Sequence, residues 1–400
     1  MALIKSLIIM KIAYILSSTN PVGGATKAVK TMLSGLMKLG VEPVIILPDK
    51  EGIYGEFKAM GMTVYALNYK LNIYPGHRTL RKCLEFVPRI LMKVVLNNRA
   101  ACQLATILQK ERVQIVHTNV GVIDIGFKAA RKAQLPHIYH IREYADLDFD
   151  MHVFPSKKHF QEQLNEPQSY SLCITRDIQR HHRQAGKATS LVVYDGIKPA
   201  TKQMPCVGKK PYLLYAGRIE PAKGLMELLQ AYNLYRQNSK EVLPIHIAGS
   251  IHDADYWQQA QQYIEEQQLQ AQVKYLGLIP NIEQLMMEAQ AIVIPSRFEG
   301  FGLCMPEAMF CGCLAIGRNT GGTKEQLDNG KQLQGSDIAL RYDTIEELAQ
   351  LLNEADHMPL TTYRQYTERA FNTVNKLYTE EKNAHDIFQL YQDILQSPRL

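Results

Sequence analysis

Short apolar runs alternate with helical stretches along this chain, and the alternation occurs twice with a break between the two series. In the first series the expected strands are Lys11–Leu16, Val44–Leu47, Val113–His117, Ile138–Ile141, Ser171–Ile174 and Leu191–Tyr194. Strands that are separated by helices form parallel βαβ units in a doubly wound sheet. A polar, proline-bearing stretch at 198–211 follows and predicts an interdomain linker. The pattern therefore predicts an α/β fold.

The alternation restarts after the linker. Its expected strands are Tyr212–Tyr215, Ile245–Ala248, Val273–Leu276 and Ala291–Ile294. A chain of 400 residues exceeds what one hydrophobic core usually serves, so we expect two Rossmann-like domains, residues 1–200 and 201–378. In neither half does the first strand lead into G-x-G-x-x-G, which argues against a nicotinamide cofactor. Within 379–400, apolar residues recur on one face of an expected helix.

Composition is that of an ordinary globular protein, with 46% hydrophobic residues and a net charge of +6. This modest charge gives no reason to expect a nucleic-acid partner. The seven cysteines are irregularly spaced, which predicts buried thiols in a reducing cytosol. The apolar segment Met1–Met10 is interrupted by Lys11 and lacks a cleavage site, so we do not expect a signal peptide, and Met10 is an alternative start.

Residues 70–112 form a strongly basic block. It holds nine Lys and Arg side chains against Glu85 and Glu111. Leu80, Leu84, Val87, Leu91 and Val94 recur in it at helical spacing, and Pro88 is expected to break or kink the helix. Two interpretations remain open: a basic amphipathic helix on an anionic membrane surface, or a solvated helix packed on its own domain.

The segment Pro295–Glu307 reads as the end of an apolar strand, a glycine-bearing loop and the start of a helix. Pro306 lies in the first turn, where its missing N–H is tolerated. The N–H groups of Gly302 and Leu303 then lie at the positive end of the helix and predict an anion site. Glu299 and Glu307 bracket the loop, and their carboxylates can accept hydrogen bonds from sugar and ribose hydroxyls.

Four further motifs occur in a fixed order. They are Gly217-Arg218 with Lys223-Gly224, the strand end Ile247–Ser250, the segment Val273–Gly277, and Gly321-Gly322 with Glu325. Together with Pro295–Glu307, this set resembles the retaining GT-B glycosyltransferases of group 1, also called family 4, from about Pro211 to Asn329. The resemblance implies two Rossmann-like domains facing a cleft, with the helix within 379–400 crossing back to the first domain.

The resemblance also implies roles for individual residues. Arg218 and Lys223 would stabilise the departing diphosphate, since Arg offers a bidentate fork and Lys a compact charge. Glu307 would bind the ribose, and Glu299 would position the donor sugar. The remaining donor-binding residues implied are Gly23 and Gly24 in the first βα loop, Gly302 and Leu303, and Leu278 beside the nucleobase.

One position departs from the family pattern. Arg142 stands where many members carry a histidine near the donor sugar, and Asp195 replaces an asparagine. Arg142 cannot act as a base. It has two interpretations: a catalytic contact with the donor, or a structural ion pair with Glu143 or Asp146. His140, two residues earlier on the same strand face, is expected to be a core histidine.

Three short polar motifs are expected to have no catalytic role. Asp146-Leu147-Asp148 and Asp253-Ala254-Asp255 match a D-x-D metal pattern, but we expect neither a metal nor a cofactor, because Arg218 and Lys223 would replace the ion. His181-His182 is expected to face solvent.

The sequence thus predicts a metal-independent hexosyltransferase that moves a sugar from a nucleotide-sugar donor, UDP being the most frequent carrier in the family. The acceptor would be a glycan or a lipid-linked intermediate of bacterial surface polysaccharide synthesis. The enzyme would be cytoplasmic, peripheral at the inner face of the membrane. A UDP-sugar epimerase of similar fold and a catalytically silent nucleotide-sugar-binding partner are the alternatives.

Overall fold

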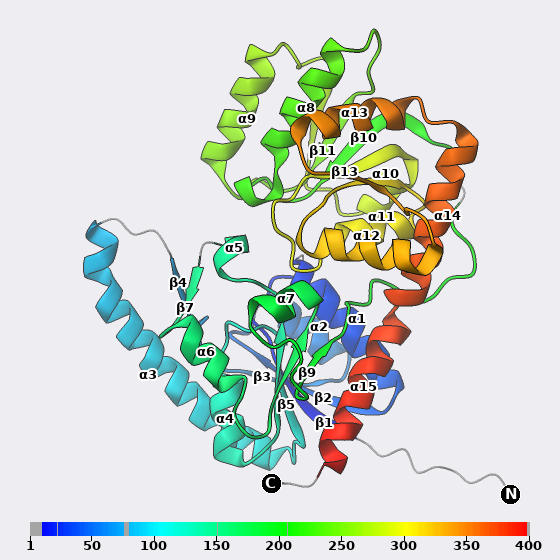
Figure 1. Ribbon diagram of the computed structural model, residues 1–400. Coiled ribbons are helices and arrows are strands. Elements are labelled where there is room, and N and C mark those ends of the chain that lie inside the picture. The colour runs from blue at the N-terminus through cyan, green and yellow to red at the C-terminus, as the bar shows by residue number, and fades with distance from the viewer. Residues whose placement is uncertain (1–9, 22, 76–79, 150, 206, 398–400) are drawn as a thin grey trace, which may run out of the picture. The chain divides into compact units, whose positions relative to one another are not determined.

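The computed structural model describes residues 10–21, 23–75, 80–149, 151–205 and 207–397, which divide into two compact units (Figure 1). The first unit joins Met1–Lys198 to Glu380–Leu400, and the second is Pro199–Thr379. The apolar segment before Met10 and Arg78 of the basic block lie outside the described residues.

The first unit is built on a seven-stranded parallel sheet in the order β3-β2-β1-β5-β6-β8-β9. Its strands are β1 (Met10–Ile15), β2 (Val41–Leu47), β3 (Thr63–Ala66), β5 (Ile115–Thr118), β6 (His137–Ile141), β8 (Ser169–Cys173) and β9 (Ser190–Val192). A separate antiparallel pair joins β4 (Ile73–Pro75) to β7 (Met151–Val153). The helices are α1 (Gly24–Lys38), α2 (Ile53–Ala59), α3 (Leu80–Lys110), α4 (Ile125–Ala133), α5 (Asp146–Phe149), α6 (Lys157–Gln163), α7 (Arg176–His181) and α15 (Glu380–Gln396).

Helix α15 belongs to the first unit although it follows the second in sequence. Its apolar face joins the core that β1 and α1 build, through Ala384, Ile387, Leu390, Tyr391 and Ile394. It lies beside α1, where Gly35 leaves room for it: a Cβ on Gly35 would come within 2.6 Å of Ala384 Cβ (Figure 1). The expected return of the C-terminal helix to the first domain is therefore confirmed.

The second unit is a six-stranded parallel sheet in the order β12-β11-β10-β13-β14-β15. Its strands are β10 (Lys210–Ala216), β11 (Ile245–Ala248), β12 (Val273–Gly277), β13 (Ala289–Ile294), β14 (Leu314–Arg318) and β15 (Leu340–Tyr342). The helices are η1 (Pro221–Lys223), α8 (Leu225–Gln237), α9 (Ala254–Glu266), α10 (Ile282–Glu288), α11 (Cys304–Phe310), α12 (Gly321–Gln334), α13 (Ile345–Asp356) and α14 (Leu360–Leu377). Helices cover both faces of the sheet (Figure 1). Numbered within the unit, this is the 3-2-1-4-5-6 order of doubly wound nucleotide-binding sheets.

Helix α3 is one continuous helix with Pro88 inside it, so the basic block is not broken at that proline. Among the helices that the structure describes, α3 included, none is both long and apolar enough to span a bilayer.

Candidate functional site

In the second unit the strand order reverses between β10 and β13, which are hydrogen-bonded neighbours. The connections from these two strands leave toward opposite edges of the sheet, and in such folds the carboxyl ends of the strands at the reversal are the usual ligand site. Arg218 and Lys223 follow β10, while Glu299 and Leu303 follow β13. The fold therefore brings together residues that lie some eighty positions apart in sequence.

The two loops at this reversal are packed closely. Arg297 N–H donates to Ala222 C=O at 2.9 Å, which ties the β13 loop to η1. Gly224 has a φ of +69°, and a Cβ there would lie 2.1 Å from Pro295 C=O. Only glycine fits at this position, because both its backbone conformation and its lack of a side chain are required. The glycine of the Lys223-Gly224 motif thus holds Lys223 against the neighbouring loop.

Lys223 and Glu299 form a direct ion pair, with Lys223 Nζ 2.7 Å from Glu299 Oε1. Their side chains are only 18% and 16% exposed. An ammonium group has three donors, so this contact leaves donors of Lys223 for a phosphate oxygen. The pair positions a cation that can bind an anionic group, and it orients the carboxylate next to it.

Arg218 lies in the same loop and is more accessible. Its Nη2 is 2.8 Å from Glu220 Oε1, and its side chain is 38% exposed. Tyr215 donates from its hydroxyl to Arg218 C=O at 2.9 Å, which fixes the backbone of the loop. Burial raises the pKa of Tyr215 well above its ordinary value, so this hydroxyl keeps its proton.

The β13 loop is held from the other side by the start of α12. Gly322 N–H donates to Glu299 C=O at 2.8 Å. A Cβ on Gly322 would lie 2.7 Å from Gly300 C=O, so glycine is needed for this approach too. Gly302 has a φ of +82°, and Leu303 directly precedes α11.

Glu307 lies in the first turn of α11 and is 91% buried, since only 9% of it is exposed. Leu278 lies elsewhere. It follows β12, two strands away from β10, and is 57% exposed. The structure therefore gathers Arg218, Lys223 and Glu299 at the reversal, whereas Leu278 lies along the sheet edge.

The first unit also reverses its strand order, between β1 and β5. Gly23 and Gly24 lie at this reversal, because Gly23 is the N-cap of α1 and Gly24 its first residue. Gly23 has ordinary extended dihedral angles, and a Cβ there would meet only Thr26 Oγ1 at 3.7 Å. No packing constraint within the described chain explains this glycine.

Arg142 follows β6 at the carboxyl edge of the first sheet, and its ion-pair partner differs from both predicted partners. Its Nη1 lies 2.6 and 2.7 Å from the two oxygens of Asp195, and its Nε donates to Asn119 Oδ1 at 3.2 Å. The arginine side chain is 7% exposed and the aspartate 6%. Of the two interpretations of Arg142, the structural ion pair is present, but its partner is Asp195; the predicted partners Glu143 and Asp146 were wrong, because the guanidinium group contacts neither of them.

Glu143 is a buried carboxylate, and the sequence indicated it only as a partner for Arg142 and not as a residue that holds the neighbouring loops. It accepts from Val122 N–H at 3.1 Å and from Arg142 N–H at 3.2 Å. Burial, with Asp148 nearby, raises the pKa of Glu143 to about 7, although backbone N–H groups oppose the shift. Glu143 thus links the loop that follows β5, through Val122, to the loop that follows β6, through Arg142. The only sequence signal was its position directly after a buried strand.

Two histidines form a buried chain with tyrosines. Tyr391 of α15 bonds Tyr14 at 3.0 Å and His117 Nδ1 at 2.6 Å, and His117 Nε2 lies 3.1 Å from His140 Nδ1. Burial lowers the pKa of His117 to about 3 and that of His140 well below its ordinary range, so both rings are neutral. His140 is a core histidine, as expected.

The expectation that His181 and His182 face solvent was wrong. His182 is 98% buried, with 2% exposed, and its Nε2 lies 2.9 Å from Glu143 C=O. His181 pairs with Asp146 at 2.8 Å. Neither therefore faces bulk solvent.

The D-x-D matches have structural contacts. Asp146 pairs with Lys157 at 3.0 Å, Asp148 accepts from Tyr144 N–H at 2.9 Å, and Asp253 caps α9 by accepting from Tyr256 N–H at 2.9 Å. Within the described ranges, no three His, Cys, Asp or Glu side chains form a group that could hold a metal ion.

Comparison with known proteins points to one class of enzyme. Residues 199–373 match the family "Glycosyl transferases group 1". The chain is 35% identical over 112 residues to the O-antigen chain mannosyltransferase B of Escherichia coli, covering 27% of this chain and 28% of that protein. It is 25% identical over 138 residues to the N-acetyl-alpha-D-glucosaminyl L-malate synthase of Bacillus anthracis, covering 34% of this chain and 35% of that protein. The matches thus span about a third of the length of these curated relatives.

A solved structure resembles the chain over nearly its whole length. The crystal structure of Anabaena Alr3699/HepE in complex with UDP matches with a TM-score of 0.74 at 17% identity, and the match covers 96% of this chain and 100% of that one. The chain therefore has the GT-B fold, and its residues 199–373 are similar to the group 1 glycosyltransferases.

Proposed function

We propose that this protein is a retaining glycosyltransferase that moves a hexose from a nucleoside diphosphate sugar, with UDP as the carrier. One observation supports this most: Lys223 and Glu299 are paired at the strand reversal of the second unit, with Arg218 in the same loop. Two cations and a carboxylate at this reversal support the binding of an anionic, hydroxyl-bearing ligand, because a doubly wound sheet usually binds its ligand there. That the related HepE structure holds UDP supports the same carrier.

In the proposed reaction the bond between the anomeric carbon and the donor phosphate oxygen breaks, and the acceptor oxygen bonds to that carbon from the same face. The acceptor proton passes to the leaving diphosphate. Arg218 and Lys223 stabilise the charge that accumulates there, without a divalent ion or cofactor. Glu299 positions the donor sugar, and Glu307 accepts from the ribose. Gly23, Gly24, Gly302, Leu303 and Leu278 complete the proposed donor site.

We further propose that the acceptor is a glycan or a lipid-linked intermediate of surface polysaccharide synthesis, handled in the cytoplasm. The described cysteines, Cys102, Cys173, Cys304, Cys311 and Cys313, are free thiols, as is usual in a reducing compartment. The match to an O-antigen mannosyltransferase supports this kind of pathway.

Slow hydrolysis of UDP-sugars tests the proposal without knowledge of the acceptor. We expect Lys223→Ala to reduce the rate by on the order of 10²–10³-fold, because a preorganised cation at the leaving phosphate is lost. Lys240→Ala, which removes an exposed lysine of the same unit, is the matched control and should leave the rate unchanged. Equal rates for wild type and Lys223→Ala would rule out the assigned role, and conversion of the sugar without release of UDP would indicate an epimerase.

A further inference from the structure

Helix α3 exposes a row of large apolar side chains that nothing in the described chain covers. Val87, Leu91 and Val95 follow one another at helical spacing and are 65%, 65% and 62% exposed, and neighbouring Met92 is 56% exposed. We call these four residues the α3 face. Residues three or four apart lie on the same side of a helix; Val87, Leu91 and Val95 are spaced by four and Met92 precedes Val95 by three, so the four make one continuous stripe. Packing on its own domain, one of the two interpretations of this segment, does not account for the stripe.

From Phe86 to the end of the helix that carries the α3 face, the charges have one sign. From Phe86 to Lys110 the helix carries Arg89, Lys93, Arg99 and Lys110 and no carboxylate. Arg89 and Arg99 are both exposed: Arg89 lies between Val87 and Leu91 in sequence, and Arg99 follows Val95 by one helical turn. An apolar stripe bordered by cations fits the boundary between the headgroups and acyl chains of an anionic bilayer.

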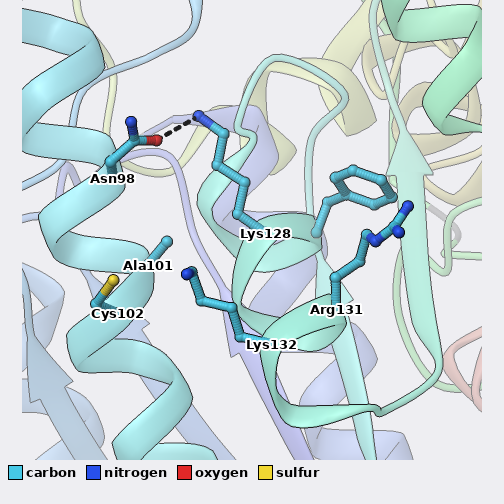
Figure 2. A pocket seen from close by; sticks show the side chains of 7 residues that line it. Asn98, Ala101, Cys102, Lys128, Arg131 and Lys132 are labelled. Atoms are coloured by element: carbon cyan, nitrogen blue, oxygen red, sulfur yellow. Dashed lines mark hydrogen bonds between the residues drawn. The ribbon is translucent and has the colours of Figure 1, made fainter.

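The same side of α3 continues into a basic cavity. Asn98 and Cys102 follow Val95 at helical spacing, and both line a cavity of 420 Å³ between α3 and α4 (Figure 2). The facing helix contributes Lys128, Arg131 and Lys132. Lys128 Nζ bonds Asn98 Oδ1 at 3.0 Å and Asp124 Oδ2 at 2.6 Å, and it thereby joins the two helices.

Lys132 extends from α4 toward α3, and it is exposed (Figure 2). Arg131 pairs with Glu166 but keeps 59% of its side chain exposed. The cavity therefore adds accessible cations beside the apolar stripe, where the headgroups of a bilayer would lie if the stripe entered it.

We propose that the α3 face inserts into a bilayer surface rich in anionic phospholipid, with Arg89, Arg99 and Lys132 against its headgroups. This extends the proposed function, on which it rests for its biological setting, because a lipid-linked acceptor lies in such a surface. Hydrolysis of the donor by the wild-type chain needs no vesicles, so it tests the reaction separately from the docking.

Vesicle sedimentation tests the face. We expect wild type to bind vesicles of phosphatidylcholine with phosphatidylglycerol, and to bind pure phosphatidylcholine much less. The double variant Leu91→Ser/Val95→Ser should weaken this binding by on the order of tenfold or more, because two aliphatic side chains no longer leave water. Leu360→Ser, at a leucine of the second unit that is 63% exposed, is the matched control and should bind as wild type does.

A separate pair of variants tests the cations beside the α3 face. Arg99→Glu should weaken binding to the anionic vesicles, and Lys240→Glu, an exposed lysine of the second unit, should not. Binding that is equal on both lipid compositions, or equal for wild type and the double variant, would overturn the proposal. So would a wild-type dimer in light scattering that the double variant dissociates, because a second copy would then cover the face.

Insertion can be measured directly, since the chain has a single tryptophan, Trp257, in the second unit. We expect acyl-brominated lipids to quench Leu91→Trp fluorescence beyond the wild-type baseline, and Leu360→Trp to stay at that baseline. Quenching no greater for Leu91→Trp than for Leu360→Trp would contradict insertion.

Discussion

At the scale of single residues, Arg142 and Asp195 stand where the resemblance to group 1 glycosyltransferases implies a histidine and an asparagine, and they contact each other. Each substitution alone would place an unpaired charge at the edge of the first sheet, whereas together they form a buried ion pair with both carboxylate oxygens on Nη1. An arginine cannot take a proton. The pair therefore fixes a hydrogen-bond donor at this edge of the first sheet and supplies no base there, which is consistent with the proposed transfer of the acceptor proton to the leaving phosphate.

The contribution of the Arg142–Asp195 pair to the free energy of unfolding can be measured. Removing one member leaves the other charge buried, so we expect Asp195→Ala to lower the free energy of unfolding of the first unit by about 3–5 kcal/mol. Arg142→Met/Asp195→Ala should recover part of this loss, because no charge is left without a partner. Urea denaturation of both single variants and the double variant measures the coupling. Additive losses would show that the two residues do not interact.

At the scale of elements, the contact between α1 and α15 depends on Gly35. A Cβ at this position would approach Ala384 Cβ to 2.6 Å and Glu380 C=O to 3.2 Å, so the two helices can lie this close only over a glycine. Ser34 and Lys38 of α1 then reach Glu380 at 3.0 and 2.6 Å. The polar start of α15 is thus joined to α1 by the same close approach that buries its apolar face.

This gives a prediction with an internal control. We expect Gly35→Ala to destabilise the first unit by about 1–3 kcal/mol, since the added methyl group overpacks the contact. Gly55→Ala, in the neighbouring helix α2, meets nothing within 4 Å and should be neutral or stabilising by up to about 1 kcal/mol. Thermal denaturation followed by circular dichroism compares the two. A Gly35→Ala variant as stable as Gly55→Ala would mean that α15 does not pack closely on α1.

At the scale of the whole molecule, Glu143 makes stability depend on pH. Its pKa is raised to about 7 from an ordinary 4.5, so the folded protein holds a proton that the unfolded chain releases. The stabilisation from this group is complete below pH 4.5 and is lost as the pH rises through about 7. We expect up to about 3 kcal/mol from this group.

Melting temperatures of wild type and Glu143→Gln across pH 4.5 to 8 check this prediction. Gln cannot ionise, so the wild-type decline between these pH values should flatten in the variant, whatever its absolute stability. Parallel curves would assign the decline to other groups.

The sequence predicts the central strands well and the peripheral ones poorly. Strands such as Ala291–Ile294 are fully apolar runs between helices, and the structure places them as expected. It also contains β3, β14 and β15, which the sequence analysis did not include. Of these, β3 and β15 are only four and three residues long, too short for a periodic signal, whereas β14 is a five-residue strand inside the second sheet.

The candidate site shows the same division. Arg218, Lys223 and Glu299 belong to contiguous motifs, so the sequence alone singles them out as candidates. The contacts of Arg142 with Asp195 and of Lys223 with Glu299 join residues 53 and 76 positions apart, so they follow only from strand order.

The position of α15 has a consequence for biosynthesis. A ribosome must release the whole of the second unit before the helix that completes the first unit can emerge. The apolar surface of α1 and β1 therefore stays open during most of translation, and the later-made unit is free to fold first. A nascent chain stalled before Glu380 should hence be a good client for chaperones that bind exposed hydrophobic segments.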